Sequence, residues 1–213
     1  GAALAIVLAG TGEGVGQAIT GSTTAALTQL LGEVGLWAAM LATALLVSHR
    51  YGTGALRRDY GLALKPVDGL WGALAALAAL LLAQLVLVAF TGTKFAGSND
   101  QLLTQQQGHE AGFVIVALIV AVGAPFFEEL FFRGFLRTCF QARFGAHGAI
   151  WLQAAIFSAA HLGEAKGWAN VSVVLALMLV GAVLGYTAKL TGRLGAGMVA
   201  HGLFNLVAVV SVL

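Results

Sequence analysis

Two adjacent glutamates, Glu128 and Glu129, occupy one of the most apolar stretches of the chain, residues 125–133, which read PFFEELFFR. A carboxylate in hydrocarbon costs several kcal/mol unless it is paired or protonated, so an acidic pair at such a depth is a candidate for chemistry. Later apolar segments contain three further polar side chains: His161, His201 and Asn205. A carboxylate base, imidazoles and an amide donor are the groups that acyl transfer requires.

The spacing of the charged groups predicts which carboxylate is available for chemistry. Glu129 and Arg133 are four residues apart and share one face of a helix, so we expect them to form a buried ion pair. Neighbouring residues on a helix point about 100° apart. Glu128 would then be free to face the histidines, although a second contact to Arg133 is an alternative.

The histidines and the asparagine can be placed by counting residues. We expect the chain to reverse near Gly145, which lies seventeen residues after Glu128 and sixteen before His161. At about 1.5 Å per residue both side chains stand about 25 Å from the turn, so antiparallel packing brings them to the same height. His201 and Asn205 are four residues apart, and their N–H groups could together stabilise a developing oxyanion.

The composition predicts an all-α, multi-pass integral membrane helical bundle. Of the 213 residues, 59% are hydrophobic and 9% are charged, against about 25% charged in a typical soluble domain. So few charged residues provide too little polar surface to cover a water-soluble globular protein. The net charge of +2 is small and argues against nucleic-acid binding. The length allows one compact bundle, so residues 1–213 are expected to form a single domain.

Apolar segments long enough to cross a bilayer predict six to seven transmembrane helices. Residues 2–9 are too short to cross alone and are interpreted as the remainder of a first helix. The other helices are expected at residues 24–48, 69–90, 113 through the glutamates, 146–161, 168–189 and 194–213. Gly181 and Gly185 form a G-x-x-x-G pair, which favours close helix packing within the chain over dimerisation.

Basic residues predict the orientation of these helices. Nine of the eleven fall in three regions, which follow residues 24–48, the glutamate pair and residues 168–189. The alternate segments contain only Lys94 and Lys166. The positive-inside rule therefore places the three regions in the cytoplasm, and we expect Trp37, Trp71 and Trp168 near membrane boundaries, as in aromatic belts.

Three motifs in these segments resemble those of the CPBP intramembrane glutamic endopeptidases, which include the type II CAAX prenyl endopeptidases. They are Glu128-Glu129-x-x-x-Arg133, Phe157-x-x-x-His161 and His201-x-x-x-Asn205. Each motif is weak alone, but together, in order and on predicted membrane helices, they are specific. The motif-bearing core covers about residues 113–213.

The resemblance implies an intramembrane endopeptidase in which Glu128, with His161, activates the attacking water. His201 and Asn205 match the residues that stabilise the tetrahedral oxyanion, and the predicted ion pair supports them. The resemblance implies no covalent acyl-enzyme, and we expect no cofactor and no metal. The spacing leaves open whether Glu128 or His161 takes the proton.

The expected substrates are peptides or membrane proteins, prenylated or not, which reach a polar cavity in the lipid bilayer from the cytoplasmic side. The abundance of alanine, glycine and leucine is typical of bacterial proteins. It favours a bacterial inner membrane and disfavours a prenylated substrate.

Two other classes of protein could use the same buried residues. A proton-coupled transporter would relay protons through Glu128, His161 and His201, but it predicts a continuous polar pathway, and neither that nor an internal repeat is evident in the sequence. A non-catalytic membrane scaffold would tolerate Glu128→Ala. A zinc protease with these three side chains as ligands is a variant of the enzyme hypothesis, although the chain contains no H-E-x-x-H motif.

Overall fold

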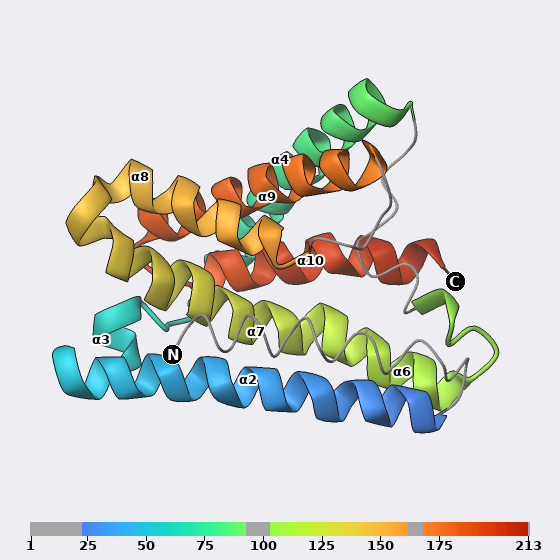
Figure 1. Cartoon of the computed structure of the whole chain (residues 1–213), viewed down its shortest axis with the longest axis horizontal. Helices are drawn as coiled ribbons and strands as arrows, with labels where there is room; N and C mark the ends of the chain where they lie inside the picture. Colours follow the sequence, from blue (N-terminus) through green and yellow to red (C-terminus); the bar gives the residue numbers. More distant parts are fainter. Residues whose placement is uncertain (1–22, 93–102, 162–167, 213) are drawn as a thin grey trace.

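The computed structural model describes residues 23–92, 103–161 and 168–212, and all regular structure in these ranges is helical. The helices lie mostly along the long axis of the molecule, and the C-terminus lies at the end opposite α3 (Figure 1). The proposed remainder of a first helix, residues 2–9, lies outside the described residues, as do Lys94 and Lys166.

The helices follow the apolar segments of the sequence, with two π-helical stretches, η1 and η2, beside the glutamates. In chain order they are α2 (Thr23–Tyr51), α3 (Leu56–Tyr60), α4 (Asp68–Thr91), α6 (Glu110–Leu118), η1 (Ile119–Gly123), α7 (Ala124–Glu128), η2 (Glu129–Leu136), α8 (Arg137–Ala159), α9 (Trp168–Thr191) and α10 (Gly195–Ser211). The long helices lie within a few residues of their predicted bounds. The sequence did not predict the five-residue α3, because one helical turn is too short to show a periodic pattern.

The predicted chain reversal at Gly145 is confirmed. Gly145 has φ 67° and ψ 175° inside α8, a conformation outside the helical region that glycine adopts without a steric penalty. The two arms of α8 therefore run in opposite directions from a tip beside Gly145 (Figure 1). The second arm ends close to His161, so the reversal brings the second motif back toward the glutamates.

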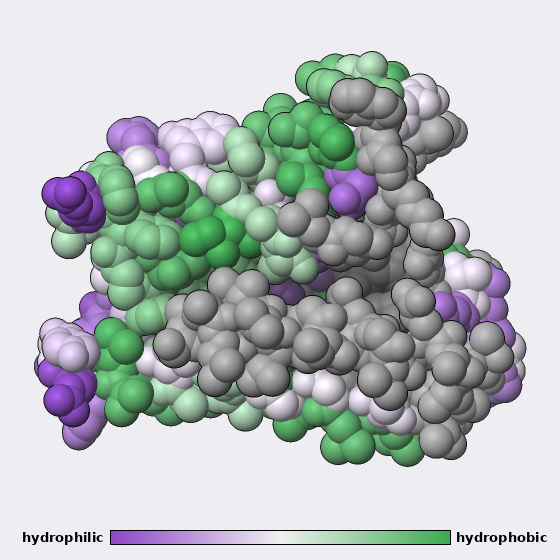
Figure 2. Space-filling model, viewed as in Figure 1, coloured by the Kyte–Doolittle hydropathy of each residue, from purple (hydrophilic) through white to green (hydrophobic). Residues whose placement is uncertain are grey.

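Four helical segments of the described chain are long and apolar enough to cross a membrane: Leu30–Tyr51, Asp68–Thr91, Glu110–Ala159 and Asn170–Thr191. The third contains the reversal at Gly145, and α10 is a shorter apolar helix. Hydrophilic residues gather toward the two ends of the long axis, with hydrophobic residues between them (Figure 2). The all-helical architecture of an integral membrane protein is thus confirmed, whereas a count of six to seven spans stays a prediction.

The predicted basic regions meet at one end of the bundle. The amide N–H of Leu194 donates to the carbonyl of Gly61 at 2.9 Å, which joins the α9–α10 connection to the segment after α3. Arg193 forms an ion pair with the buried Asp68, with Nη2 2.6 Å from Oδ1. The tip of α8 lies at the same end (Figure 1). This arrangement fits the basic-residue pattern, and the cytoplasmic assignment of this end stays a prediction.

The expected boundary position of Trp37 is wrong. Its side chain is buried in the core, and its ring stacks on Phe127 with centroids 4.8 Å apart. Gly123 makes room for the indole, because a Cβ at that position would lie 2.1 Å from a ring carbon. Trp37 therefore packs α2 against the helix that carries the glutamates.

The glycine pair of α9 packs within the chain, as predicted. A Cβ on Gly181 would lie 3.1 Å from Ala154, and one on Gly185 would lie 2.8 Å from the side-chain nitrogen of Gln153. Gln153 Nε2 also donates to the carbonyl of Gly181 at 2.9 Å. This close contact fixes the second arm of α8, and with it Phe157, against α9.

Candidate active site

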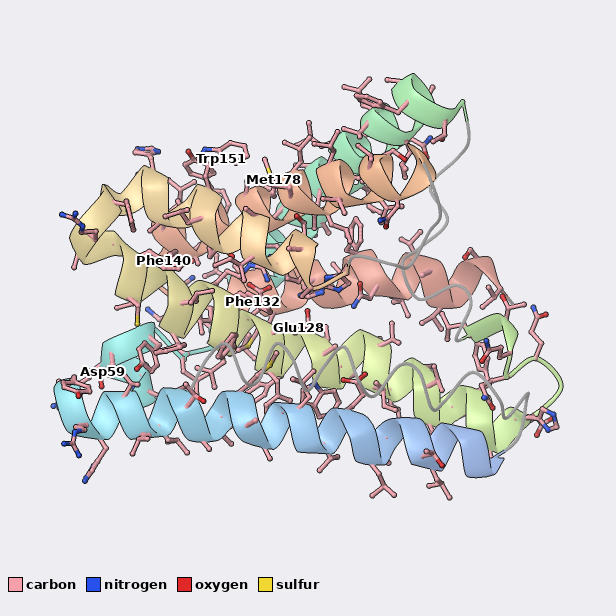
Figure 3. The ribbon with its side chains drawn as sticks, viewed as in Figure 1. Asp59, Glu128, Phe132, Phe140, Trp151 and Met178 are labelled. Atoms are coloured by element: carbon pink, nitrogen blue, oxygen red, sulfur yellow. The ribbon has the colours of Figure 1, made fainter. Side chains whose placement is uncertain are left out.

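The two glutamates lie where the helix changes its geometry. Glu128 is the last residue of α7 and Glu129 the first of the π-helical η2. Short π-helical turns within α-helices are rare overall. Those that do occur are often found at functional sites. Glu128 lies near the middle of the long axis of the bundle (Figure 3). The carboxylates are therefore placed far from either polar end.

The predicted ion pair between Glu129 and Arg133 is confirmed. Nη1 of Arg133 lies 3.0 Å from Oε1 of Glu129, and both side chains are fully buried. Two opposite charges removed from water cost free energy individually, and each is tolerated because the other is present. The pair thus places one compensated charge at the centre of the bundle.

Phe157 supports this buried cation. The guanidinium carbon of Arg133 lies 4.2 Å from the centroid of the Phe157 ring, within the range of a cation–π interaction. The same ring lies 4.8 Å from the ring of His161 and 5.9 Å from that of His201. Phe157 thus contacts one residue from each of the three motifs.

His201 lies between the two glutamates. Its Nδ1 is 3.1 Å from Oε1 of Glu129, and its Nε2 is 3.9 Å from Oε2 of Glu128. An ionised carboxylate only accepts hydrogen bonds, so the Nδ1 proton of His201 donates to Glu129. The other ring nitrogen is thereby directed toward Glu128.

The contact between Glu129 and His201 was not predicted, although one residue could have indicated it. Gly197 precedes His201 by one helical turn, and a Cβ there would lie 2.7 Å from Oε2 of Glu129. The G-x-x-x-H spacing on α10 therefore leaves space for a carboxylate beside the imidazole. Glu129 consequently holds both Arg133 and His201 rather than Arg133 alone.

Glu128 is the more accessible of the two carboxylates. Its side chain is 18% exposed, against 0% for Glu129. Its Oε2 atom is itself buried and accepts no hydrogen bond from the described residues. Glu128 thus combines partial access with an oxygen that can accept a proton or a hydrogen bond.

His161 follows the second arm of α8. Its Nδ1 lies 2.8 Å from the carbonyl oxygen of Phe157. A carbonyl can only accept, so Nδ1 carries the proton and, in the neutral ring, Nε2 carries the lone pair. His161 contacts the cluster through Phe157, and its predicted juxtaposition with Glu128 stays a prediction.

Asn205 lies one turn after His201 on α10, and both are buried. Its Nδ2 donates to the carbonyl oxygen of Val120 in η1 at 2.8 Å. The sequence placed Asn205 beside His201 on one face but did not predict this backbone partner. No group of three or more His, Cys, Asp or Glu side chains within the described ranges is arranged to hold a metal ion.

Comparison with known proteins agrees with the arrangement of these three motifs. Residues 110–207 match the family model of the type II CAAX prenyl endopeptidases described as Rce1-like. The matched segment spans just under half of the chain and is similar to the Rce1-like CAAX proteases. The matched CAAX protease segment runs from the start of α6 into α10 and includes all the candidate residues named above.

This match supports the resemblance that the motifs indicated. A CAAX protease is a peptidase of the membrane, which agrees with the apolar helices of this chain. Comparisons with curated proteins and with solved structures returned no match.

Proposed function

We propose that this protein, like a CAAX protease, hydrolyses a peptide bond within the bilayer, with water activated by Glu128 and His161. His201 and Asn205 donate to the oxyanion of the tetrahedral intermediate. The observation that carries the proposal is the position of His201, whose Nε2 faces Glu128 at 3.9 Å while its Nδ1 is held by Glu129 at 3.1 Å. One imidazole thus joins both glutamates of the first motif to the third.

The proposed reaction needs one water molecule and no covalent intermediate. The water oxygen bonds to the carbonyl carbon of the substrate while one water proton passes to Glu128 or to Nε2 of His161. The negative charge that develops on the carbonyl oxygen is stabilised by an N–H of Asn205 and by Nε2–H of His201, which is an imidazolium at this step because its Nδ1–H is bonded to Glu129. The C–N bond then breaks, and the same base returns the proton to the departing amine.

The ion pair of Glu129 and Arg133 has a distinct role in this proposal. Because Arg133 compensates the charge of Glu129, Glu128 is the carboxylate of the pair that is not bound to the arginine. Glu129 also accepts a hydrogen bond from Nδ1–H of His201, and this bond fixes the orientation of the imidazole ring. A fixed donor needs no reorganisation when the oxyanion forms, which is the main source of its effect on the rate.

The proposed substrates follow from the position of the site. Glu128 lies midway along the apolar bundle, so the scissile bond must enter the membrane region (Figure 3). Peptides and membrane-protein segments meet this requirement, with or without a prenyl group. If substrates enter from the basic end of the bundle, they reach the site from the cytoplasmic side. This route fits a location in a bacterial inner membrane.

The proposal is tested with the purified chain in proteoliposomes. The probes are an internally quenched farnesylated peptide ending in Cys-a-a-X and the same peptide without the lipid. Glu128→Gln removes the base but keeps the shape, and Glu110→Gln at the exposed start of α6 is the matched control. We expect Glu128→Gln to lower kcat by about 10²–10⁴-fold and the control to leave it unchanged.

The outcomes separate the alternatives. Cleavage that persists in Glu128→Gln contradicts the proposed mechanism. Cleavage that is lost on exhaustive chelation and restored by zinc supports a metalloprotease instead. Glu128-dependent proton uptake into the liposomes without cleavage supports a transporter.

A further inference from the structure

The helix before the glutamates leaves one backbone carbonyl without a helical donor. In η1 the amide N–H of Ala124 donates to the carbonyl of Ile119 and not to that of Val120, its α-helical partner. The next residue that could donate to Val120 is Pro125, which has no N–H. The π-turn and the proline together therefore free the Val120 carbonyl from the helix.

Asn205 supplies the missing donor from α10. Its Nδ2 lies 2.8 Å from the carbonyl oxygen of Val120, and the side chain is 6% exposed. A carbonyl oxygen accepts hydrogen bonds and repels another oxygen, so this contact excludes the flipped orientation of the amide. One N–H of Asn205 is thus committed to Val120, and the direction of the second N–H is fixed by the planar amide.

The neighbouring carbonyl faces α10 as well. In a regular helix the carbonyl of Ala121 would accept a hydrogen bond from the N–H of residue 125, and Pro125 lacks that group. A Cβ on Gly202 would lie 2.9 Å from the Ala121 oxygen, so glycine at 202 permits the close approach of α10 to η1. The Val120 carbonyl and the Ala121 carbonyl, whose α-helical donor Pro125 removes, therefore both lie against the helix that carries His201 and Asn205.

We infer that Pro125 is a positioning residue: by freeing the Val120 carbonyl, it orients the Asn205 amide so that its second N–H is available to the oxyanion. This inference rests on the proposed role of Asn205. An alanine at 125 would restore the backbone N–H, which in the i to i−5 register of η1 competes with Asn205 for the Val120 oxygen. The amide would then lose its fixed orientation without any change in the residues that touch the substrate.

The inference is tested by a double-mutant cycle of Pro125→Ala and Asn205→Ala. The thermal midpoint of unfolding in detergent is measured for all four proteins. We expect Asn205→Ala to lower Tm in the wild-type background, where it leaves the buried Val120 carbonyl without a donor. In the Pro125→Ala background the loss should be clearly smaller, because the new N–H takes that place. Equal losses in the two backgrounds would overturn the inference.

The kinetic arm of the cycle uses the same quenched peptides. Pro125→Ala should lower kcat on the order of tenfold at an unchanged KM, because it misplaces a donor rather than removing a binding contact. Asn205→Ala should then cost less in the Pro125→Ala background than in the wild type. Pro66→Ala, at the only other proline, is the control and should combine additively with Asn205→Ala in both arms.

The two arms distinguish which idea fails. In one outcome the effects of the two substitutions on Tm are coupled, but Asn205→Ala does not change kcat. That result would support the Asn205–Val120 hydrogen bond. It would refute the oxyanion role of Asn205, and with it the positioning role of Pro125. A large effect of Asn205→Ala on kcat that is additive with Pro125→Ala would leave the proposed function intact and refute the positioning role alone.

Discussion

Nδ1 of His201 lies 3.1 Å from Oε1 of Glu129, the same oxygen that lies 3.0 Å from Nη1 of Arg133. One buried carboxylate oxygen therefore joins the first and third motifs. This shared oxygen gives the adjacent glutamates different roles, because Glu129 is fully buried and paired while Glu128 remains partly accessible. Stability and activity should separate accordingly.

Replacement of the two glutamates by glutamine should have opposite consequences. Glu129→Gln leaves Arg133 as a buried charge without its counter-ion and should destabilise the protein by about 3–5 kcal/mol. Glu128→Gln should lower kcat by about 10²–10⁴-fold while the free energy of unfolding stays within about 1 kcal/mol of the wild type, because the fully buried Glu129–Arg133 ion pair is kept. Thermal or denaturant unfolding in detergent, beside the peptide assay, measures both. A larger loss of stability in Glu128→Gln than in Glu129→Gln would reverse the assigned roles.

Gly197→Ala should impair catalysis through the position of Glu129. The new Cβ would lie 2.7 Å from Oε2 of Glu129, so the carboxylate must shift and His201 loses its fixed partner. A displacement of about 1 Å can cost about 10²-fold in kcat, and we expect a loss of that order. Gly35→Ala on α2 is the control, since no atom lies within 4 Å of its Cβ position. A Gly197→Ala enzyme with wild-type kcat would show that the carboxylate does not need this position.

Phe157→Leu should destabilise the buried Arg133. The substitution removes the ring that lies 4.2 Å from the guanidinium, an interaction worth about 2 kcal/mol in a desolvated site. Phe90→Leu, at a side chain 58% exposed on α4, should change stability by less than about 0.5 kcal/mol. If both substitutions change the unfolding free energy equally, Phe157 acts only by filling space.

Acidification should weaken the connection between α2 and α3. Asp59 accepts hydrogen bonds from the hydroxyl of Ser48 and from the backbone and side chain of Thr53, and these bonds, that of Ser48 first, lower the pKa of its carboxyl group. A lowered pKa in the folded state means that the carboxylate stabilises the fold above its unfolded pKa. That contribution is lost as the pH falls through the folded pKa. Tm measured between about pH 3 and 6 should therefore fall less steeply in Asp59→Asn than in the wild type. Parallel curves would contradict this role.

The sequence predicted those features that depend on local pattern. The long helices, the Glu129–Arg133 pair and the reversal at Gly145 follow from hydrophobic length, i to i+4 spacing and the conformational freedom of glycine. Each can be derived without knowing which helices are neighbours. The expected roles of Glu128 and His161 came from the family resemblance and stay proposals.

The features that were missed depend on contacts between helices. The π-turn η1 packs against α10 and η2 packs against α2, and no periodicity in the sequence indicates either turn. The Glu129–His201 contact and the Asn205–Val120 hydrogen bond depend on how α10 is rotated about its axis. Trp37 was placed at a boundary because indole is common there, whereas Gly123 provides an internal site for its ring.

The most direct test compares the peptides in membranes from cells that express the wild type, Glu128→Gln or the control Glu110→Gln. Mass spectrometry of new termini identifies substrates whatever their sequence. We predict at least one cleavage product that is present with the wild type and the control and absent with Glu128→Gln. The same set of termini in all three samples, with equal amounts of each protein in the membrane, would contradict Glu128-dependent hydrolysis.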